Sequence, residues 1–108
     1  MIAIPLADQN SFVVEASLEG NTYFLRLDWN SEAGLWVLGL QDARTAVVLQ
    51  GVALVPGSPL LGQFRHLAVP PGEFMVHRQD DSLSLGRDSF RNAQATLYYM
   101  SEAEYAAL

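Results

Sequence analysis

The sequence contains no cysteine and no lysine, and it is poor in charged residues of either sign. Without cysteine there is no disulfide framework, no thiolate metal ligand and no thiol nucleophile. Charged residues make up 17% of the 108 residues, and acids outnumber bases to give a net charge of −6. An acidic chain without a basic cluster repels nucleic-acid phosphates and anionic lipids. We therefore expect neither a nucleic acid nor a membrane as a partner.

Long hydrophobic runs are also missing from the chain. The first residues, Met1 to Leu6, contain no basic residue and no long apolar stretch, so they do not resemble a signal peptide. No apolar run approaches the roughly 20 residues that cross a bilayer. We expect synthesis in the cytoplasm without signal-dependent export. Half of the residues are nevertheless hydrophobic, which excludes disorder and favours a partner over part of the surface, although a compact β fold also hides apolar residues.

Alternation of apolar and polar residues is the strongest positive signal in the sequence. Phe12 to Leu18 and Tyr23 to Trp29 both alternate, and Glu19-Gly20-Asn21 between them suits a tight turn. Further strands are predicted over residues 35–40, 45–55, 74–78 and 95–100, with turn-forming residues between them. This spacing predicts a mainly β fold, either an antiparallel β-sandwich or a small β-barrel, with a short C-terminal helix.

The chain shows no linker or internal repeat that would divide it. We therefore expect a single β domain over residues 1–108, with an N-terminal arm of about residues 1–10 and a short helical tail of about residues 101–108. Ser101 and Glu104 have the spacing of a capping box, in which each side chain accepts a hydrogen bond from the other residue's backbone amide. This pair predicts where the tail helix begins.

Residues with catalytic or metal-binding chemistry form no recognisable pattern. Asp28, Asn30 and Glu32 resemble the start of a calcium loop, but the sixth position is Ala33 and the twelfth is Gly39, where that loop needs glycine and an acid. Two histidines without cysteine are too few for a typical zinc site. No glycine-rich phosphate-binding motif occurs. We expect a protein that is not an enzyme, with no catalytic residues, no metal site and no cofactor.

The apolar segment from Val55 to Pro71 is a candidate contact surface. Such a loop in a small domain is usually functional or bound, but it also occurs folded back over an open sheet end. Tyrosines near the C-terminus suit either core packing or protein contacts. The candidate interface residues are Leu60, Leu61, Phe64, Leu67, Tyr98 and Tyr105. If this assignment holds, a charge at Leu60 or Leu61 should impair assembly more than folding.

Several short motifs follow one another along the chain in the order in which a known family has them. They are Leu25-x-Leu27-x-Trp29-Asn30, the strand residue Trp36, Pro70-Pro71-Gly72-Glu73 and Leu85-Gly86-Arg87-Asp88-Ser89-Phe90. From about Pro5 to Glu104 the chain resembles the phage baseplate plug proteins, small virion proteins of contractile-tailed phages. The resemblance implies a structural component of the tail baseplate, located in the virion. It further implies contacts with other baseplate or tail proteins, as a homo- or hetero-oligomer, and it brings no active-site residues.

One alternative function belongs to a different class. A small β-barrel that binds a small ligand would need an internal cavity, and a barrel of about 100 residues has little room for one. The large apolar side chains at the expected inward positions, such as Leu25 and Trp36, argue against such a cavity. Binding to other proteins is therefore the preferred reading of the sequence.

Overall fold

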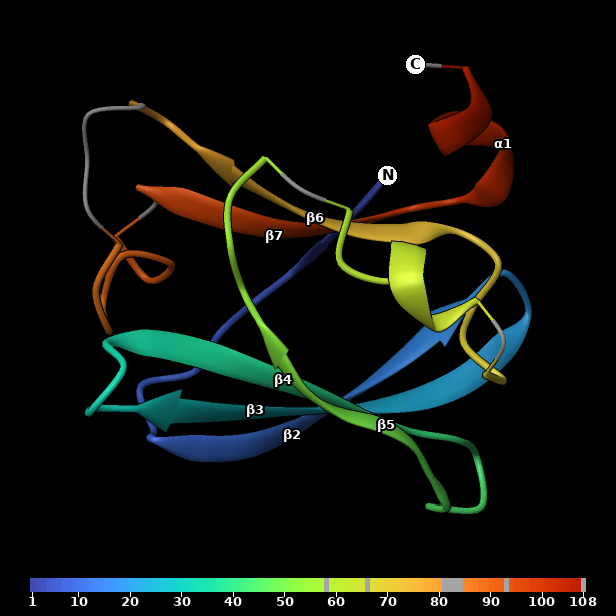
Figure 1. Cartoon of the computed structure of the whole chain (residues 1–108), viewed down its shortest axis with the longest axis horizontal. Helices are drawn as coiled ribbons and strands as arrows, with labels where there is room; N and C mark the ends of the chain where they lie inside the picture. Colours follow the sequence, from blue (N-terminus) through green and yellow to red (C-terminus); the bar gives the residue numbers. More distant parts are fainter. Residues whose placement is uncertain (58, 66, 81–84, 93, 108) are drawn as a thin grey trace.

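The computed structural model describes residues 1–57, 59–65, 67–80, 85–92 and 94–107, and these form two antiparallel sheets that face each other as two layers (Figure 1). The three-stranded sheet has the order β1-β7-β6, and the four-stranded sheet has the order β2-β3-β4-β5. The strands are β1 (Ile2–Ile4), β2 (Ser11–Leu18), β3 (Asn21–Asn30), β4 (Leu35–Gln41), β5 (Val47–Ala53), β6 (Glu73–Arg78) and β7 (Ala95–Met100).

The hairpin of β2 and β3 is confirmed, with Leu18 paired to Asn21 across a two-residue turn. Gly20 adopts a left-handed backbone conformation, as the sequence suggests, but the other left-handed residue is Glu19 and not Asn21, with φ of 86° and 52°. A left-handed residue other than glycine is costly unless its surroundings hold it in place. The Glu19 carboxylate accepts hydrogen bonds from the Tyr99 hydroxyl and the Glu102 amide, and these contacts hold the turn against β7.

The core fills the space between the two sheets. Alternate side chains of each central strand point inward, as period-two patterning requires, and the inward leucines of β3 and β4 are fully buried. Trp36 on β4 lies in this core, whereas Trp29 on β3 is only half-buried. The central buried residues are Leu18, Leu25, Leu27, Leu38, Leu40, Leu61, Phe74, Val76, Leu97 and Tyr99.

One side of the sandwich is bridged by the segment that follows β5. In Figure 1 this segment rises from the four-stranded layer to the three-stranded layer. The Leu54 amide donates to the Trp36 carbonyl on β4 over 2.9 Å. Beyond it, the Gly57 amide donates to the Val76 carbonyl on β6 over 3.1 Å, beside an isolated parallel bridge from Pro56 to Val76. This single bridge does not close a barrel in the described part of the chain, so of the two predicted architectures the sandwich is confirmed.

Both ends of the chain lie on the three-stranded sheet. The sequence did not predict β1, because three residues carry too little pattern, yet Ile2 pairs with Tyr99 and Ile4 with Leu97. The C-terminal helix α1 (Glu102–Ala106) is confirmed, and Ser101 and Glu104 form the predicted capping box. The N-terminal amine also contacts the Glu104 carboxylate. No helix in the described residues is long and apolar enough to cross a membrane.

Candidate interaction surface

The structure places two of the predicted interface residues inside the protein. Leu60 is 4% exposed and Leu61 is not exposed at all. The reason is local: the Leu60 amide donates to the Phe74 carbonyl on β6 over 3.1 Å, which draws the segment over the open side of the sandwich. Leu60 and Leu61 therefore fit the other possibility for this loop, in which it folds back over an open end of the sheet. Because both side chains are buried, we now expect a charge at either position to impair folding rather than assembly alone.

A buried carboxylate holds this segment in place, and sequence reasoning missed it. Glu73 is 1% exposed, and its Oε1 accepts hydrogen bonds from the amides of Leu61 and Phe74. Its Oε2 lies 3.1 Å from the Arg65 guanidinium, which also donates to the carbonyls of Pro70 and Gly72. An acid at the start of a strand ordinarily indicates a solvated turn, so pattern alone could not distinguish this one. Glu73 therefore holds the loop at Leu61 and Arg65 against the start of β6.

Removal of the Glu73 carboxylate is expected to destabilise the protein without changing its surface. Glu73→Ala leaves two amides without their acceptor and Arg65 without its anionic partner. We expect this to cost about 3 kcal/mol, or a melting temperature lower by more than about 10 °C. Glu73→Gln keeps one oxygen for the two amides and should lose about half as much. Thermal melts followed by circular dichroism measure both. Equal melting temperatures for Glu73→Ala and the native chain would show that the anchor is dispensable.

A depression of about 540 Å³ lies between β5 and this segment. Val55 is 41% exposed at its rim, and Phe64, half-buried in the 3-10 helix η1 (Gly62–Phe64), forms part of its wall. Leu67, which is 37% exposed, follows η1. The residues that line the depression are Gly51, Val52, Ala53, Val55, Pro59, Leu60 and Phe64. Phe64 and Leu67 thus keep exposed surface, unlike Leu60 and Leu61, and their role in a contact stays a prediction.

A second depression, of about 350 Å³, lies on the outer face of the three-stranded sheet. All three methionines of the chain, Met1, Met75 and Met100, line it together with Tyr98. Methionine adapts its shape to different neighbours, and tyrosine suits partly buried contacts. Tyr105 does not line this depression; it is 38% exposed on α1. Tyr98 and Tyr105 therefore occupy separate places, and the six predicted residues do not form one patch.

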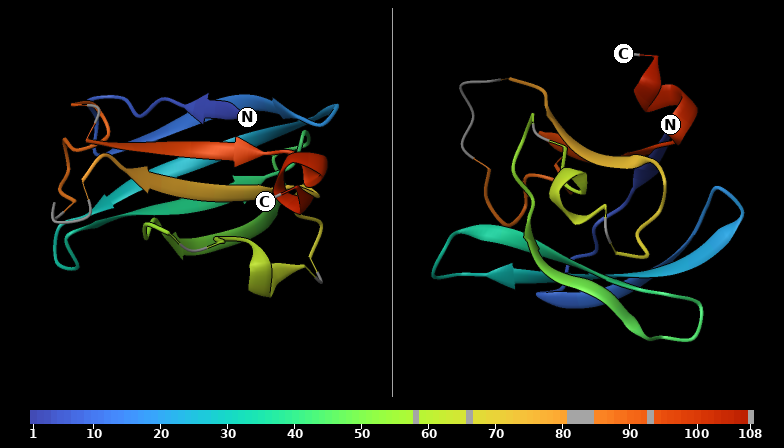
Figure 2. Two further views of the ribbon diagram at one scale, coloured as in Figure 1. Left: turned by 90° about the horizontal axis from the view of Figure 1, so that it is seen from above. Right: turned by 45° about the vertical axis from the view of Figure 1, so that its right-hand side comes forward.

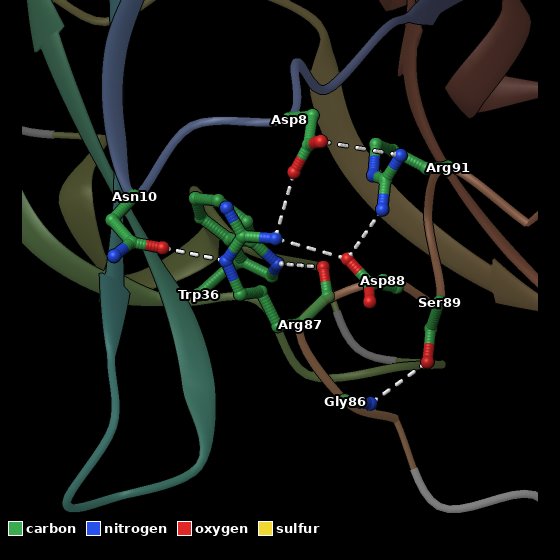
Figure 3. A network of polar contacts seen from close by, with 8 residues as sticks. All are labelled: Asp8, Asn10, Trp36, Gly86, Arg87, Asp88, Ser89 and Arg91. Carbon is green, nitrogen blue, oxygen red and sulfur yellow. Dashed lines mark hydrogen bonds and ion pairs between the residues drawn. The ribbon is translucent and has the colours of Figure 1, made fainter.

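A network of charges fastens the connection between β6 and β7 to the segment before β2 (Figure 3). The Arg87 guanidinium contacts Asp8 at 2.9 Å and Asp88 at 3.0 Å, and Arg91 contacts Asp88 at 2.8 Å. The hydrogen bond from Arg91, with the charge of both arginines, lowers the pKa of Asp88. The Trp36 indole donates to the Arg87 carbonyl over 3.1 Å. The two arginines and two aspartates pair with one another, so this network ties the two segments together.

The Tyr99 hydroxyl joins three elements inside the protein. It donates to the Glu19 carboxylate and accepts from the Gly72 amide over 2.8 Å. Burial, and next the hydrogen bond to Glu19, raise the pKa of Tyr99 well above its ordinary value. The hydroxyl therefore remains a hydrogen-bond donor at neutral pH. Its place in the fold makes it a link between β7, the β2–β3 turn and the loop before β6.

The side chains that could ligate a metal are dispersed over the described residues. No group of three or more histidine, cysteine, aspartate or glutamate side chains gathers there into a possible metal site. His66, one of the two histidines, lies outside the described residues. The remaining features of interest are the two depressions and the exposed apolar side chains around them.

Comparison with known proteins adds one finding. The family model described as the cyanophage baseplate Pam3 plug gp18 matches residues 1–102 of the chain. A search of curated proteins found no match to the chain. The match includes both sheets and the segment between β5 and β6, so it spans both depressions, while Tyr105 on α1 lies beyond it.

Proposed function

Because the chain belongs to the family of the cyanophage baseplate plug, we propose that it is a plug component of a phage contractile-tail baseplate that works through protein contacts alone. Its partners are other baseplate or tail proteins, and its place is the tail of the virion. It needs no catalytic group, metal or cofactor for this role. The observation that carries the proposal is the family match over residues 1–102.

The surface best suited to these contacts is the depression between β5 and the segment after it. Exposed Val55 and half-buried Phe64 line a hollow here, and exposed Leu67 follows in the same segment. Apolar patches on a folded protein commonly mark interaction sites. Val55 and Leu67 are too exposed to serve the core and too apolar to favour water. Side chains of this kind contribute to binding chiefly when a partner removes them from water. We assign Val55, Phe64 and Leu67 to the contact with a baseplate neighbour.

A charge at Val55 should weaken binding to that neighbour and leave the fold intact. The matched control is Val47, the first residue of β5, whereas Val55 lies two residues beyond the end of that strand. Val47 is 59% exposed against 41% for Val55, but it does not line the depression. Each variant, Val55→Asp and Val47→Asp, is co-expressed with the baseplate and tail proteins encoded by the same phage. Loss of one buried valine contact and burial of a charge should lower affinity at least about tenfold for Val55→Asp.

The measurement is co-purification followed by titration of the purified pair, with thermal melts of each variant alone. Equal binding by both variants would reject this surface and leave the baseplate role standing. If the native chain forms no complex with any of those proteins, the baseplate role itself is rejected.

A further inference from the structure

β2 is the one long strand edge that the described residues leave open. The outer edge of β6 is covered, since Val76 and Phe74 accept hydrogen bonds from Gly57 and Leu60. β5 carries a bulge, with left-handed Gly51 and shifted pairing to β4. β1 has only three residues. Figure 2 shows β1 and β2 on the side of the molecule opposite the bridging segment. Folded proteins usually protect long regular edges, since such edges pair with other strands.

The backbone groups on the open edge of β2 can be assigned from its pairing with β3. The Trp29 amide donates to the Asn10 carbonyl over 2.7 Å, and the ladder continues without a break to the turn. Antiparallel pairs alternate between bonded and non-bonded, so the even-numbered residues of β2 bond to β3. The amides and carbonyls of Val13, Glu15 and Ser17 therefore point outward. Within the described residues, no backbone hydrogen bond outside the β2–β3 ladder involves them.

The inward side chains of β2 are also incompletely covered. Phe12, Val14 and Ala16 pack against the core but are only half-buried, whereas the inward leucines of β3 beside them are fully buried. A further strand along this edge would cover them and satisfy the outward backbone groups at once. β2 contains no proline and no lysine, and Glu15 is its only charged residue. The residues that usually keep an edge from pairing are thus nearly absent.

We propose that β2 pairs antiparallel with β2 of a second copy of this chain, about a two-fold axis at Val14. The strand spans residues 11–18, so full overlap places the axis at residue 14 or residue 15. An axis between them would set inward side chains against outward ones. An axis at Glu15 would set two glutamates directly opposite, which is unfavourable. An axis at Val14 sets Glu15 opposite Val13 and Phe12 opposite Ala16, and it bonds the outward groups of both strands.

The charge of the chain predicts how this dimer responds to salt. Each copy carries a net charge of −6, so two copies repel each other at long range. Added salt screens that repulsion. The pairing therefore strengthens as ionic strength rises, whereas contacts between opposite charges weaken. One strand edge is a small interface, so we expect dissociation at about 100 µM, the range of weak complexes.

Two experiments test the pairing, and neither depends on the baseplate role. Analytical ultracentrifugation of the native chain across that concentration range should show a monomer–dimer equilibrium that shifts to dimer in higher salt. Glu15→Pro removes one outward amide and should abolish the dimer, while Glu15→Ala keeps that amide and should retain it. A native chain that stays monomeric throughout, or a Glu15→Pro variant that dimerises as well as Glu15→Ala, overturns the proposal.

The second experiment tests the register by disulfide cross-linking. The native chain has no cysteine, so an introduced cysteine is the only thiol that can react. Across the axis, the two Val14 residues form a non-bonded pair with Cα atoms about 4.5 Å apart, a distance that a disulfide spans. Val14→Cys should form a disulfide-linked dimer in a glutathione buffer at least about tenfold faster than Val13→Cys, whose position faces Glu15. Intact mass under non-reducing conditions measures both. Equal rates would reject this register. If Val14→Cys does not fold, ultracentrifugation of Glu15→Pro and Glu15→Ala decides whether the β2 edge pairs.

Discussion

Replacing Leu61 with aspartate is expected to remove a large part of the stability of the protein. Leu61 has no exposed surface and lies where the segment after β5 meets the core. An aspartate there must bury an unpaired charge or open the sandwich, and either costs about 4 kcal/mol or more. Domains of this size are stable by only about 5–15 kcal/mol. Thermal melts followed by circular dichroism should show a melting temperature lower by about 15 °C or more.

The matched control for this variant is Leu67→Asp, in the same segment. Leu67 is 37% exposed, so an aspartate there stays in contact with water and should shift the melting temperature by only a few degrees. The pair separates the two roles that the segment combines, which are covering the core and presenting a surface. A Leu61→Asp variant that melts within a few degrees of the native chain would show that the segment is not part of the core.

Replacing Gly72 with alanine is expected to cost about 3 kcal/mol or more, because there is no space for a side chain. A Cβ atom at this position would lie 1.9 Å from the Met100 carbonyl oxygen and 2.5 Å from the Tyr99 hydroxyl. The carbonyl belongs to β7 and cannot turn aside as a long side chain does. The added methyl group would also push the Gly72 amide away from the Tyr99 hydroxyl that it bonds. The loop before β6 would have to leave the sheet.

Gly86→Ala is the control for this substitution. A Cβ atom at Gly86 meets no other atom within 4 Å, so this variant should melt within about 2 °C of the native chain. Urea unfolding of the three proteins gives the free energies directly. If Gly72→Ala is as stable as Gly86→Ala, the close approach of this loop to β7 is not present in solution.

The contact surface predicted from the sequence stays a prediction, but the structure shows which of its residues are buried. Hydrophobicity marks Leu60, Leu61, Phe64 and Leu67 equally, because composition does not record which side of a loop faces the protein. Hydrogen bonds to Glu73 and Phe74 decide that question, and they turn the two leucines inward. Phe64 and Leu67 lie beyond that attachment and stay nearer the surface. The Glu73–Arg65 pair itself had no signal in the sequence that would distinguish it from solvated charges.

The sequence alone determined the features that depend on neighbouring residues. Alternation along the chain defined most strands and their inward faces, glycine and asparagine marked the first hairpin, and the Ser101–Glu104 pair marked the start of α1. These patterns follow from backbone geometry within a few residues. The resemblance to the baseplate plug family also came from the order of such local motifs, and the family match confirms it.

Only the tertiary structure decided the features that join distant residues. It chose a sandwich over a barrel, brought β1 beside β7, and placed Glu19 on Tyr99 across 80 positions of sequence. It also left β2 with an unpaired edge while the other edges were covered, bulged or short. Whether a strand edge or a leucine faces water depends on what the rest of the chain places beside it. Such pairings are set by the packing of the whole core, which no local pattern encodes.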